Sequence, residues 1–576
     1  MAETLISPGV LARENDQSFL TSQPITVGAA IIGPTVKGPV ELPTVVTSYS
    51  EYVNIFGDVL TSGSNTYSYF TSITAYNYFI NGGETLLVAR VVSGTYSEAT
   101  SSFISGSTAG AIASGSTFVL ETISEGVIMN STSPEVSGSL TSGSRDNIRW
   151  EIVNPSTSSG TFSLLVRRGD DVSISNPIVL ETWPNLSLDP LAPNFISKVI
   201  GDYRLAWNGS TSDPQVVVSG SYPNASKYIR VKSVNASALT PNYFDNNGIP
   251  KPEYVDFIPV AQSGSFGAAT GDVTGGANFW NTINNTNSQG IVADNYDGMI
   301  ALLSNQDDYR FNALFTPGLV QDFASHVSKI STIVTNTQNR GDNIFIADMT
   351  GYGSTVTNAV SKASSINSSY AATYWPWCQI LDPATGKNVW VPASTLIAGV
   401  FANNDRVAEP WFAPAGINRG GLSQVIRAEQ KISQPNRDVL YQGKVNPIAT
   451  LPGTGVVVYG QKTLQTRASA LDRVNVRRLL IELKSYISQV ANTLVFDQNT
   501  IATRNQFLSQ VNPYLESVQQ RQGLFAFQVV MDDTNNTNDV IDRNQLVGQI
   551  YIQPTRTVEF IYLDFNITPT GATFPV

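Results

Sequence analysis

The sequence is poor in the residues on which many enzymes and metal proteins depend. Among 576 residues there is one cysteine, Cys378, and one histidine, His326. An intramolecular disulfide framework is therefore excluded, and so are zinc motifs that need several cysteines or two histidines. A Ser-His-Asp hydrolase would have to use His326 as its base, but no G-x-S-x-G turn is present to supply a nucleophile. We therefore expect no enzyme activity, no metal and no cofactor.

Charged residues and long apolar runs are scarce as well. Charged residues make up 14% of the chain, against roughly 25% in average proteins, and the formal net charge is −11. Nucleic-acid binders usually have a basic balance, so we expect no direct binding to nucleic acid. No run of about 18 apolar residues occurs, and the N-terminus lacks a basic region followed by an apolar stretch. We therefore expect neither membrane insertion nor a secretory signal.

Glycine, serine, threonine and asparagine take the place of the charged residues, and they favour turns and β-rich structure. Serine, threonine and glycine are most frequent between residues 93 and about 147. Short strand-like runs appear in and after this stretch, at 118–120, 127–129, 148–153 and 162–167. Short strands separated by turn clusters favour an inserted β domain, although a disordered linker is the alternative.

The remaining segments alternate between strand and helix patterns. Residues 24–34 form an apolar run between turn residues, 70–80 have helical spacing, and 86–92 form a second apolar run. Strand, helix and strand in this order indicate an α/β layer. We therefore predict a multidomain α+β and α/β fold, with an α/β core built from N- and C-terminal parts and an inserted β-rich outer domain. The expected divisions are an N-terminal extended arm (1–20), a middle α/β domain (21–92 with 186–340), an inserted β-rich protruding domain (93–185), a C-terminal core domain (341–555) and a C-terminal strand or arm (556–576).

A long amphipathic helix is the most regular feature. Between Val476 and Leu494, apolar residues recur every three or four positions on one face. Positive charge gathers around the start of this helix, at Arg473, Arg477, Arg478 and Lys484. These side chains are either a solvated helix face or a docking surface for an acidic partner.

The last predicted strand, 557–567, is apolar on both faces. Val558, Phe560 and Tyr562 alternate with Glu559, Ile561 and Leu563. A strand of this kind favours aggregation unless both of its faces are covered.

Two segments resemble ligand sites only superficially. Residues 455–463 (GVVVYGQKT) lack phosphate-loop spacing and read as a strand followed by a turn. Residues 532–539 (DDTNNTND) lack the glycine and glutamate of a calcium-binding EF-hand loop, so a polar turn is expected.

Several spaced elements, in order, resemble the signature region of contractile tail sheath proteins of phages. Residues 7–10 (SPGV) look like that family's N-terminal arm, and 475–497 are similar to its C-terminal helix. The resemblance covers most of the chain and is weakest at 93–147. The signature elements are 370–377 (YAATYWPW), 382–386 (DPATG), 391–394 (VPAS), 398–405 (AGVFANND) and 411–416 (WFAPAG).

The resemblance implies a structural subunit that forms stacked hexameric rings around an inner tail tube. It implies a virion protein, assembled in the host cytoplasm, that also meets baseplate and tail terminator proteins and contracts by collective rearrangement. Extended arms would add strands to sheets of neighbouring subunits, and the basic helix start (Arg473, Arg477, Arg478, Lys484) would face the tube. The expected arm residues are Ser7, Pro8, Gly9, Val10, Val558, Phe560, Tyr562, Leu563 and Phe565.

Two other functions are compatible with parts of the sequence. The same type of subunit could belong to a phage-derived injection device, which genomic neighbours would distinguish from a phage. A β-rich carbohydrate-binding virion protein could share the composition, but it would not need the ordered signature of residues 370–416.

Overall fold

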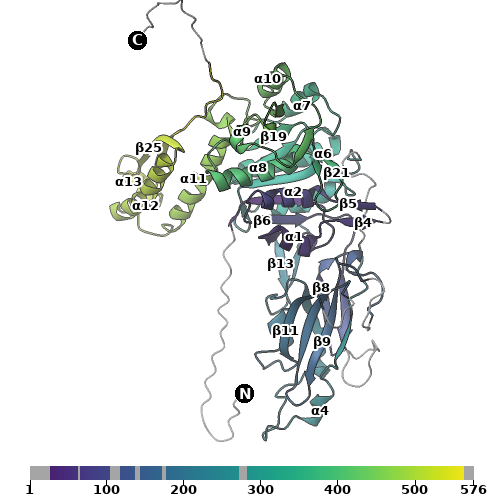
Figure 1. The fold of residues 1–576 in the computed structure, drawn as a ribbon. Helices are drawn as coiled ribbons and strands as arrows, with labels where there is room; N and C mark the ends of the chain where they lie inside the picture. The colour runs from purple at the N-terminus through teal and green to yellow at the C-terminus, as the bar shows by residue number, and fades with distance from the viewer. Residues whose placement is uncertain are drawn as a thin grey trace, which may run out of the picture.

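The computed structural model describes residues 26–62, 65–103, 117–135, 143–171, 177–271 and 282–562. These residues form an α/β core, a β sandwich on one side of it, and a C-terminal lobe of helices and a hairpin (Figure 1). The predicted class, a multidomain α+β and α/β fold, is confirmed.

One eight-stranded sheet runs through the α/β core, in the order β24-β23-β19-β18-β17-β2-β6-β3. The strands from β23 to β6 are parallel, and β24 and β3 are antiparallel edges. Most inner strands are apolar runs buried on both faces, as a sheet covered by helices requires. The strands are β2 (Ala29–Gly33), β3 (Thr44–Val46), β6 (Leu86–Arg90), β17 (Ala313–Val320), β18 (Ile344–Asp348), β19 (Ala371–Trp375), β23 (Asn446–Leu451) and β24 (Gly455–Val458).

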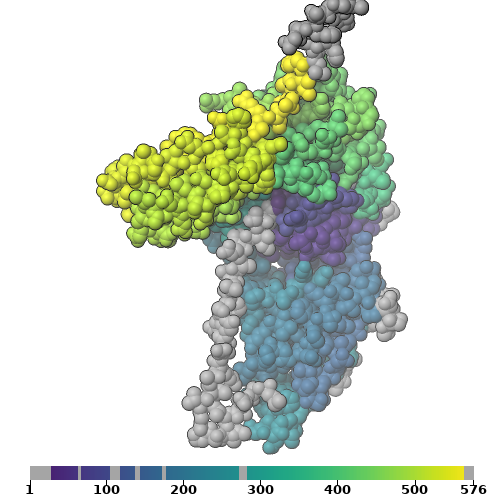
Figure 2. Space-filling view, turned by 60° about the vertical axis from the view of Figure 1, so that its left-hand side comes forward, coloured from purple at the N-terminus to yellow at the C-terminus, as the bar shows by residue number. Residues whose placement is uncertain are grey.

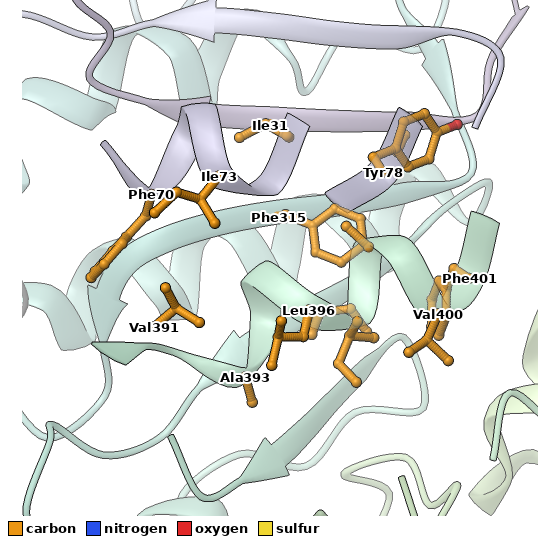
Figure 3. Packing of buried hydrophobic residues seen from close by; sticks show 14 of the residues in the cluster. Ile31, Phe70, Ile73, Tyr78, Phe315, Val391, Ala393, Leu396, Val400 and Phe401 are labelled. Carbon is orange, nitrogen blue, oxygen red and sulfur yellow. The ribbon is translucent and has the colours of Figure 1, made fainter. Parts of the chain in front are cut away.

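Helices cover both faces of this sheet. On one face, Phe70 and Ile73 of α2 meet Leu396 of α8 over Ile31 and Phe315 of the strands (Figure 3). A second cluster of buried apolar residues packs the other helices against the opposite face. The first face carries α1 (Tyr49–Phe56), α2 (Phe70–Ile80) and α8 (Ala393–Val407), and the second carries α5 (Asp297–Leu302), α6 (Ala324–Arg340), α7 (Val356–Ala363) and α10 (Gln434–Gln442).

The β sandwich packs a four-stranded sheet, β11-β10-β9-β15, on a three-stranded sheet, β14-β8-β7. Aromatic rings fill the space between them, with Phe103 centred 4.3 Å from Trp150 and 4.5 Å from Phe118. The strands are β7 (Glu98–Phe103), β8 (Phe118–Glu125), β9 (Ile148–Ser156), β10 (Thr161–Arg168), β11 (Val179–Ser187), β14 (Ile229–Val234) and β15 (Gln262–Ser265).

The strands are grouped differently from the divisions expected from the sequence. The eight-stranded sheet crosses the boundary expected at residue 340, because β2 pairs with β17 and β17 pairs with β18. The sandwich continues past the boundary expected at residue 185, since β14 and β15 belong to its two sheets. The strand expected at 127–129 is wrong, because Val127–Met129 is a short 3-10 helix. Hydrophobic period identifies a strand but not its partner, so these groupings could not be read from the sequence.

The C-terminal lobe packs α11 (Val474–Asn492) against α12 (Ile501–Gln520) and a hairpin of β25 (Leu524–Val530) and β26 (Gln549–Pro554). Helix α11 begins and ends within two residues of the predicted amphipathic helix. The smaller elements are β1 (Thr26–Val27), β4 (Leu60–Ser62), β5 (Asn65–Tyr67), α3 (Ile196–Ile200), β12 (Arg204–Trp207), β13 (Val216–Ser219), α4 (Pro252–Val255), β16 (Arg310–Phe311), β20 (Cys378–Leu381), β21 (Asn388–Val391), α9 (Gly416–Arg419), β22 (Val425–Ala428) and α13 (Asn538–Asp542).

Candidate functional site

The expected arm residues are only partly within the described chain. Ser7, Pro8, Gly9 and Val10, and Leu563 and Phe565 at the other end, lie outside the described residues. Val558, Phe560 and Tyr562 lie within them, in a segment of residues 556–562 that we call the C-terminal arm. The arm contains no strand, contrary to the prediction for 557–562. An extended segment becomes a strand only when another strand pairs with it, and no such pair forms within the described chain.

The arm presents its apolar side chains to solvent. Val558 is 79% exposed, Phe560 67% and Tyr562 88%. In Figure 2 the last described residues, in yellow, rise from the lobe beside the green core. A contiguous group of exposed apolar side chains on a soluble chain usually marks a surface that another chain covers.

The hairpin of the C-terminal lobe has free edges. Strand β25 pairs with β26 and, among the described residues, neither has a second neighbour. Phe525 on β25 and Tyr551 on β26 are both exposed. An isolated two-stranded hairpin with unpaired N–H and C=O groups is a template for strand addition from another chain.

The arginines at the start of α11 do not form the solvated or docking face expected of them. The Arg477 side chain is buried, with its guanidinium carbon 3.9 Å from the centre of the Tyr370 ring. Arg478 is also buried and donates to Asp405 Oδ2 at 2.5 Å. Both partners belong to the signature segments 370–377 and 398–405. The arginines therefore fasten the lobe to the core, and their side chains are not available to a tube.

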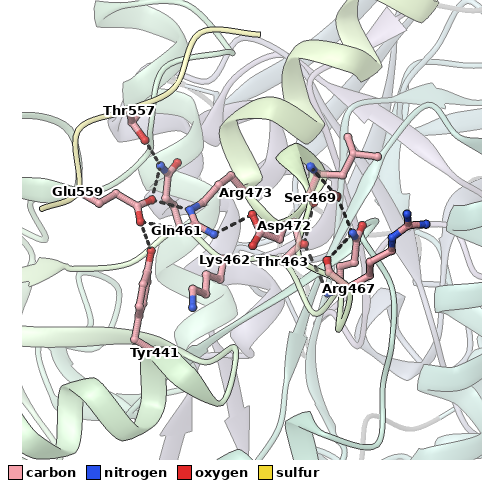
Figure 4. A network of polar contacts seen from close by, with 12 residues as sticks. Tyr441, Gln461, Lys462, Thr463, Arg467, Ser469, Asp472, Arg473, Thr557 and Glu559 are labelled. Atoms are coloured by element: carbon pink, nitrogen blue, oxygen red, sulfur yellow. Dashed lines mark hydrogen bonds and ion pairs between the residues drawn. The ribbon is translucent and has the colours of Figure 1, made fainter. Parts of the chain in front are cut away.

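The other two basic residues have different surroundings. Lys484 is exposed and donates to the Tyr370 hydroxyl at 3.1 Å, so it remains a candidate contact for an external partner. Arg473, the residue before α11, donates to both carboxylate oxygens of Glu559 in the arm, at 2.7 and 3.0 Å (Figure 4). A bidentate pair of this kind is among the strongest polar contacts available to a protein. Sequence reasoning missed Glu559, because nothing in its neighbourhood predicts a partner 86 residues away.

The residues considered for catalysis have structural surroundings. His326 is buried in α6, and its Nδ1 accepts a hydrogen bond from the Val320 backbone N–H at 3.0 Å. Burial lowers the pKa of His326 to about 4, so the ring is neutral near pH 7. Cys378 is buried, and burial raises the pKa of its thiol. Residues 455–458 form β24, which confirms the strand expected in 455–463.

The described part of the chain has neither a metal-binding cluster nor a membrane-spanning helix. Within the residues that the structure describes, no group of three or more histidine, cysteine, aspartate or glutamate side chains is arranged to hold a metal ion. None of the helices described is long and apolar enough to cross a bilayer.

Comparison with known families gives two matches on the C-terminal half. Residues 293–464 match the phage tail sheath protein central domain, and 466–568 match the phage tail sheath C-terminal domain. The second match includes the lobe and the described arm. Much of the eight-stranded sheet, from β17 to β24, falls within the first.

Individual relatives agree with these matches. The tail sheath protein of Vibrio phage KVP40 is 40% identical over 225 residues, which are 39% of this chain and 34% of the relative. That of Enterobacteria phage T4 is 41% identical over 209 residues, or 36% of this chain and 32% of the relative. The aligned segments thus span about a third of the length of these relatives.

The fold extends the likeness to nearly the whole chain. The crystal structure of a sheath tail protein from Listeria innocua superposes with a TM-score of 0.51 at 10% identity, covering 92% of this chain and 95% of the other. At this identity the likeness concerns the fold alone. Residues 293–464 and 466–568 of this chain therefore carry the central and C-terminal domains of phage tail sheath proteins.

Proposed function

We propose that this chain is the structural subunit of a contractile phage tail sheath. Subunits assemble as stacked, hexameric rings around an inner tail tube, and the sheath contracts by collective rearrangement that drives the tube through the host envelope. Baseplate and tail terminator proteins meet its two ends. The work is mechanical, done by a change between two packings of the same subunits, and it uses no catalytic residue.

The observation that carries this proposal is that one chain has both an exposed apolar arm and a hairpin with unpaired edges. The arm of one subunit adds as a strand to the β25–β26 hairpin of another, which covers its apolar residues and satisfies the hairpin's free backbone groups. Both partners of the contact are present in every copy, so the contact can link successive copies head to tail, as a closed ring or as an open helix.

Negative-stain electron microscopy of the purified chain at high concentration tests this function. We expect rings or hollow striated tubes, and we expect a chain that ends at Arg556 to remain unassembled while keeping its thermal unfolding transition. If the full chain stays monomeric, the experiment is repeated with the tube protein of the same phage as a nucleus. A monomer under both conditions contradicts the proposal.

A further inference from the structure

The carboxylate of Glu559 is held by three side chains from separate parts of the fold (Figure 4). It accepts two hydrogen bonds from Arg473, one from the Tyr441 hydroxyl at 2.5 Å and one from Gln461 Nε2 at 3.1 Å. Gln461 Nε2 also donates to Thr557 Oγ1 at 2.6 Å. Tyr441 lies on α10, Gln461 follows β24, and Arg473 precedes α11. The arm is therefore tied to the core at two of its residues.

The residues of the core that surround Glu559, which we call the cradle, carry a net positive charge when the arm is left out. The Lys462 ammonium lies 4.1 Å from the centre of the Tyr441 ring, close to Arg473. Burial, together with the charges of Lys444 and Arg473, lowers the pKa of Lys462 to about 8. Asp472 is the core's own acid at this place, 2.8 Å from Arg473. The cradle therefore suits one further carboxylate, which the arm supplies.

The arm buries its polar side chains and exposes its apolar ones, the opposite of what its own stability would favour. Thr557 and Glu559 are half-buried against the core, whereas Val558, Phe560 and Tyr562 are exposed. A segment that folded only for its own stability would bury the apolar residues and leave the carboxylate in water. The polar residues of the arm thus attach it to its own subunit, and the apolar residues stay available.

We propose that Glu559 is a positioning residue for assembly. Held by Arg473, Tyr441 and Gln461, it fixes the root of the C-terminal arm, so that residues 560–562 leave the core in one direction, toward a second copy of this chain. This inference rests on the proposed function. The root is fastened next to the core at Tyr441 and Gln461, although β26, immediately before the arm, belongs to the lobe. The arm consequently spans the junction between lobe and core before it reaches its neighbour.

The direction of the arm can be measured in the full-length monomer by electron–electron resonance distances between spin labels. The only cysteine, Cys378, is buried, so labels can be placed at Ser361→Cys on the core and Tyr562→Cys on the arm. We expect a narrow distance distribution in the otherwise unchanged chain and in Glu559→Asp, which keeps the charge. Glu559→Gln and Glu559→Ala should broaden it. Asp539→Asn, which removes a carboxylate from an exposed ion pair with Arg543, is the matched control.

The same variants, without labels, are then compared in assembly by sedimentation. The concentration needed for half-assembly should rise about tenfold in Glu559→Gln and stay unchanged in Asp539→Asn. An unaltered distance distribution, or unaltered assembly, in Glu559→Gln overturns the inference. If the chain ending at Arg556 assembles as well as the full chain, the arm-based function itself fails. If that chain fails to assemble while Glu559→Gln behaves as the unmodified protein, only the positioning role fails.

Discussion

Asp348, the last residue of β18, accepts two hydrogen bonds from Ser394 in the first turn of α8. The Ser394 hydroxyl donates to Asp348 Oδ2 at 2.5 Å, and the Ser394 backbone N–H donates to Oδ1 at 3.1 Å. The contact joins a buried strand end to the signature segment 391–394. A carboxylate near a helix N-terminus also benefits from the helix dipole.

This contact predicts a pH dependence of stability. Burial raises the pKa of Asp348 to about 7, and the bonds from Ser394 only partly offset it. An unfolded aspartate titrates near about 3.9, so the folded state holds a proton that the unfolded state has released. The Asp348 contribution is therefore greatest below about pH 4 and is lost as pH rises through about 7. As pH rises from 5 to 8, the free energy of unfolding of Asp348→Asn should increase by ~2 kcal/mol relative to that of the unmodified protein. Thermal unfolding of both proteins across this pH range measures the difference. Parallel pH profiles for the two proteins would contradict this.

Gly399 allows α8 to approach α2 closely. A side chain at position 399 should therefore lower the free energy of unfolding. An added Cβ would lie 2.8 Å from the Asn77 carbonyl oxygen and 2.7 Å from Asn81 Nδ2. Alanine normally stabilises a helix interior by about 1 kcal/mol relative to glycine, but here the backbone contact must give way. We expect Gly399→Ala to lower the free energy of unfolding by about 1 to 3 kcal/mol in denaturant titration.

Gly421→Ala is the matched control, because a Cβ at that position meets its nearest atom at 3.8 Å. Equal effects of the two substitutions would mean that the close approach of the helices does not determine the cost at Gly399.

The arginines of α11 should affect folding and not an external contact. Arg477→Ala removes a buried guanidinium from the Tyr370 ring, and we expect it to destabilise the chain by about 1 to 3 kcal/mol. Lys484→Ala, at an exposed position of the same helix, should change stability by less than about 0.5 kcal/mol. Denaturant titration of both variants checks the stability, and co-sedimentation with tube protein checks binding. Unchanged stability with lost tube binding in Arg477→Ala would return this residue to the tube-facing surface.

The β sandwich should fold without the rest of the chain. Its entry and exit lie side by side, since the Ser97 backbone N–H donates to the Thr270 carbonyl at 3.0 Å. It also has its own aromatic core. A fragment of residues 95–271 should unfold cooperatively, and Phe118→Ala within it should cost about 3 to 5 kcal/mol, as for a buried phenylalanine. A gradual, non-cooperative melt of the fragment would show that the sandwich depends on the α/β core.

Local features of the fold could be predicted from the sequence, whereas long-range partners could not. The apolar spacing from Val476 to Leu494 places α11 within two residues, because amphipathic period is a local property. The β-rich character of the insertion follows from its turn residues. The pairing of β2 with β17 is different, since it joins segments almost 300 residues apart and leaves no trace in either hydrophobic pattern.

The candidate site likewise has one part that the sequence predicts and one part that it does not. The apolar residues of the arm mark it in the sequence as a segment that needs cover. The burial of Arg477 and Arg478 could not be foreseen, because cations on a helix are ordinarily solvated and their partners Tyr370 and Asp405 lie far away in the chain. The role of Glu559 could not be foreseen either, because its partner Arg473 is 86 residues away.

The proposed assembly is tested most directly by locating the arm of one subunit within the assembled polymer. A photoreactive benzoylphenylalanine replaces Tyr562, and copies carrying it are mixed with isotopically heavy copies before assembly and illumination. We expect cross-links from position 562 of one copy to residues of β25 or β26 in a copy of the other isotope. Cross-links confined to single copies, or directed to the β sandwich, would contradict it.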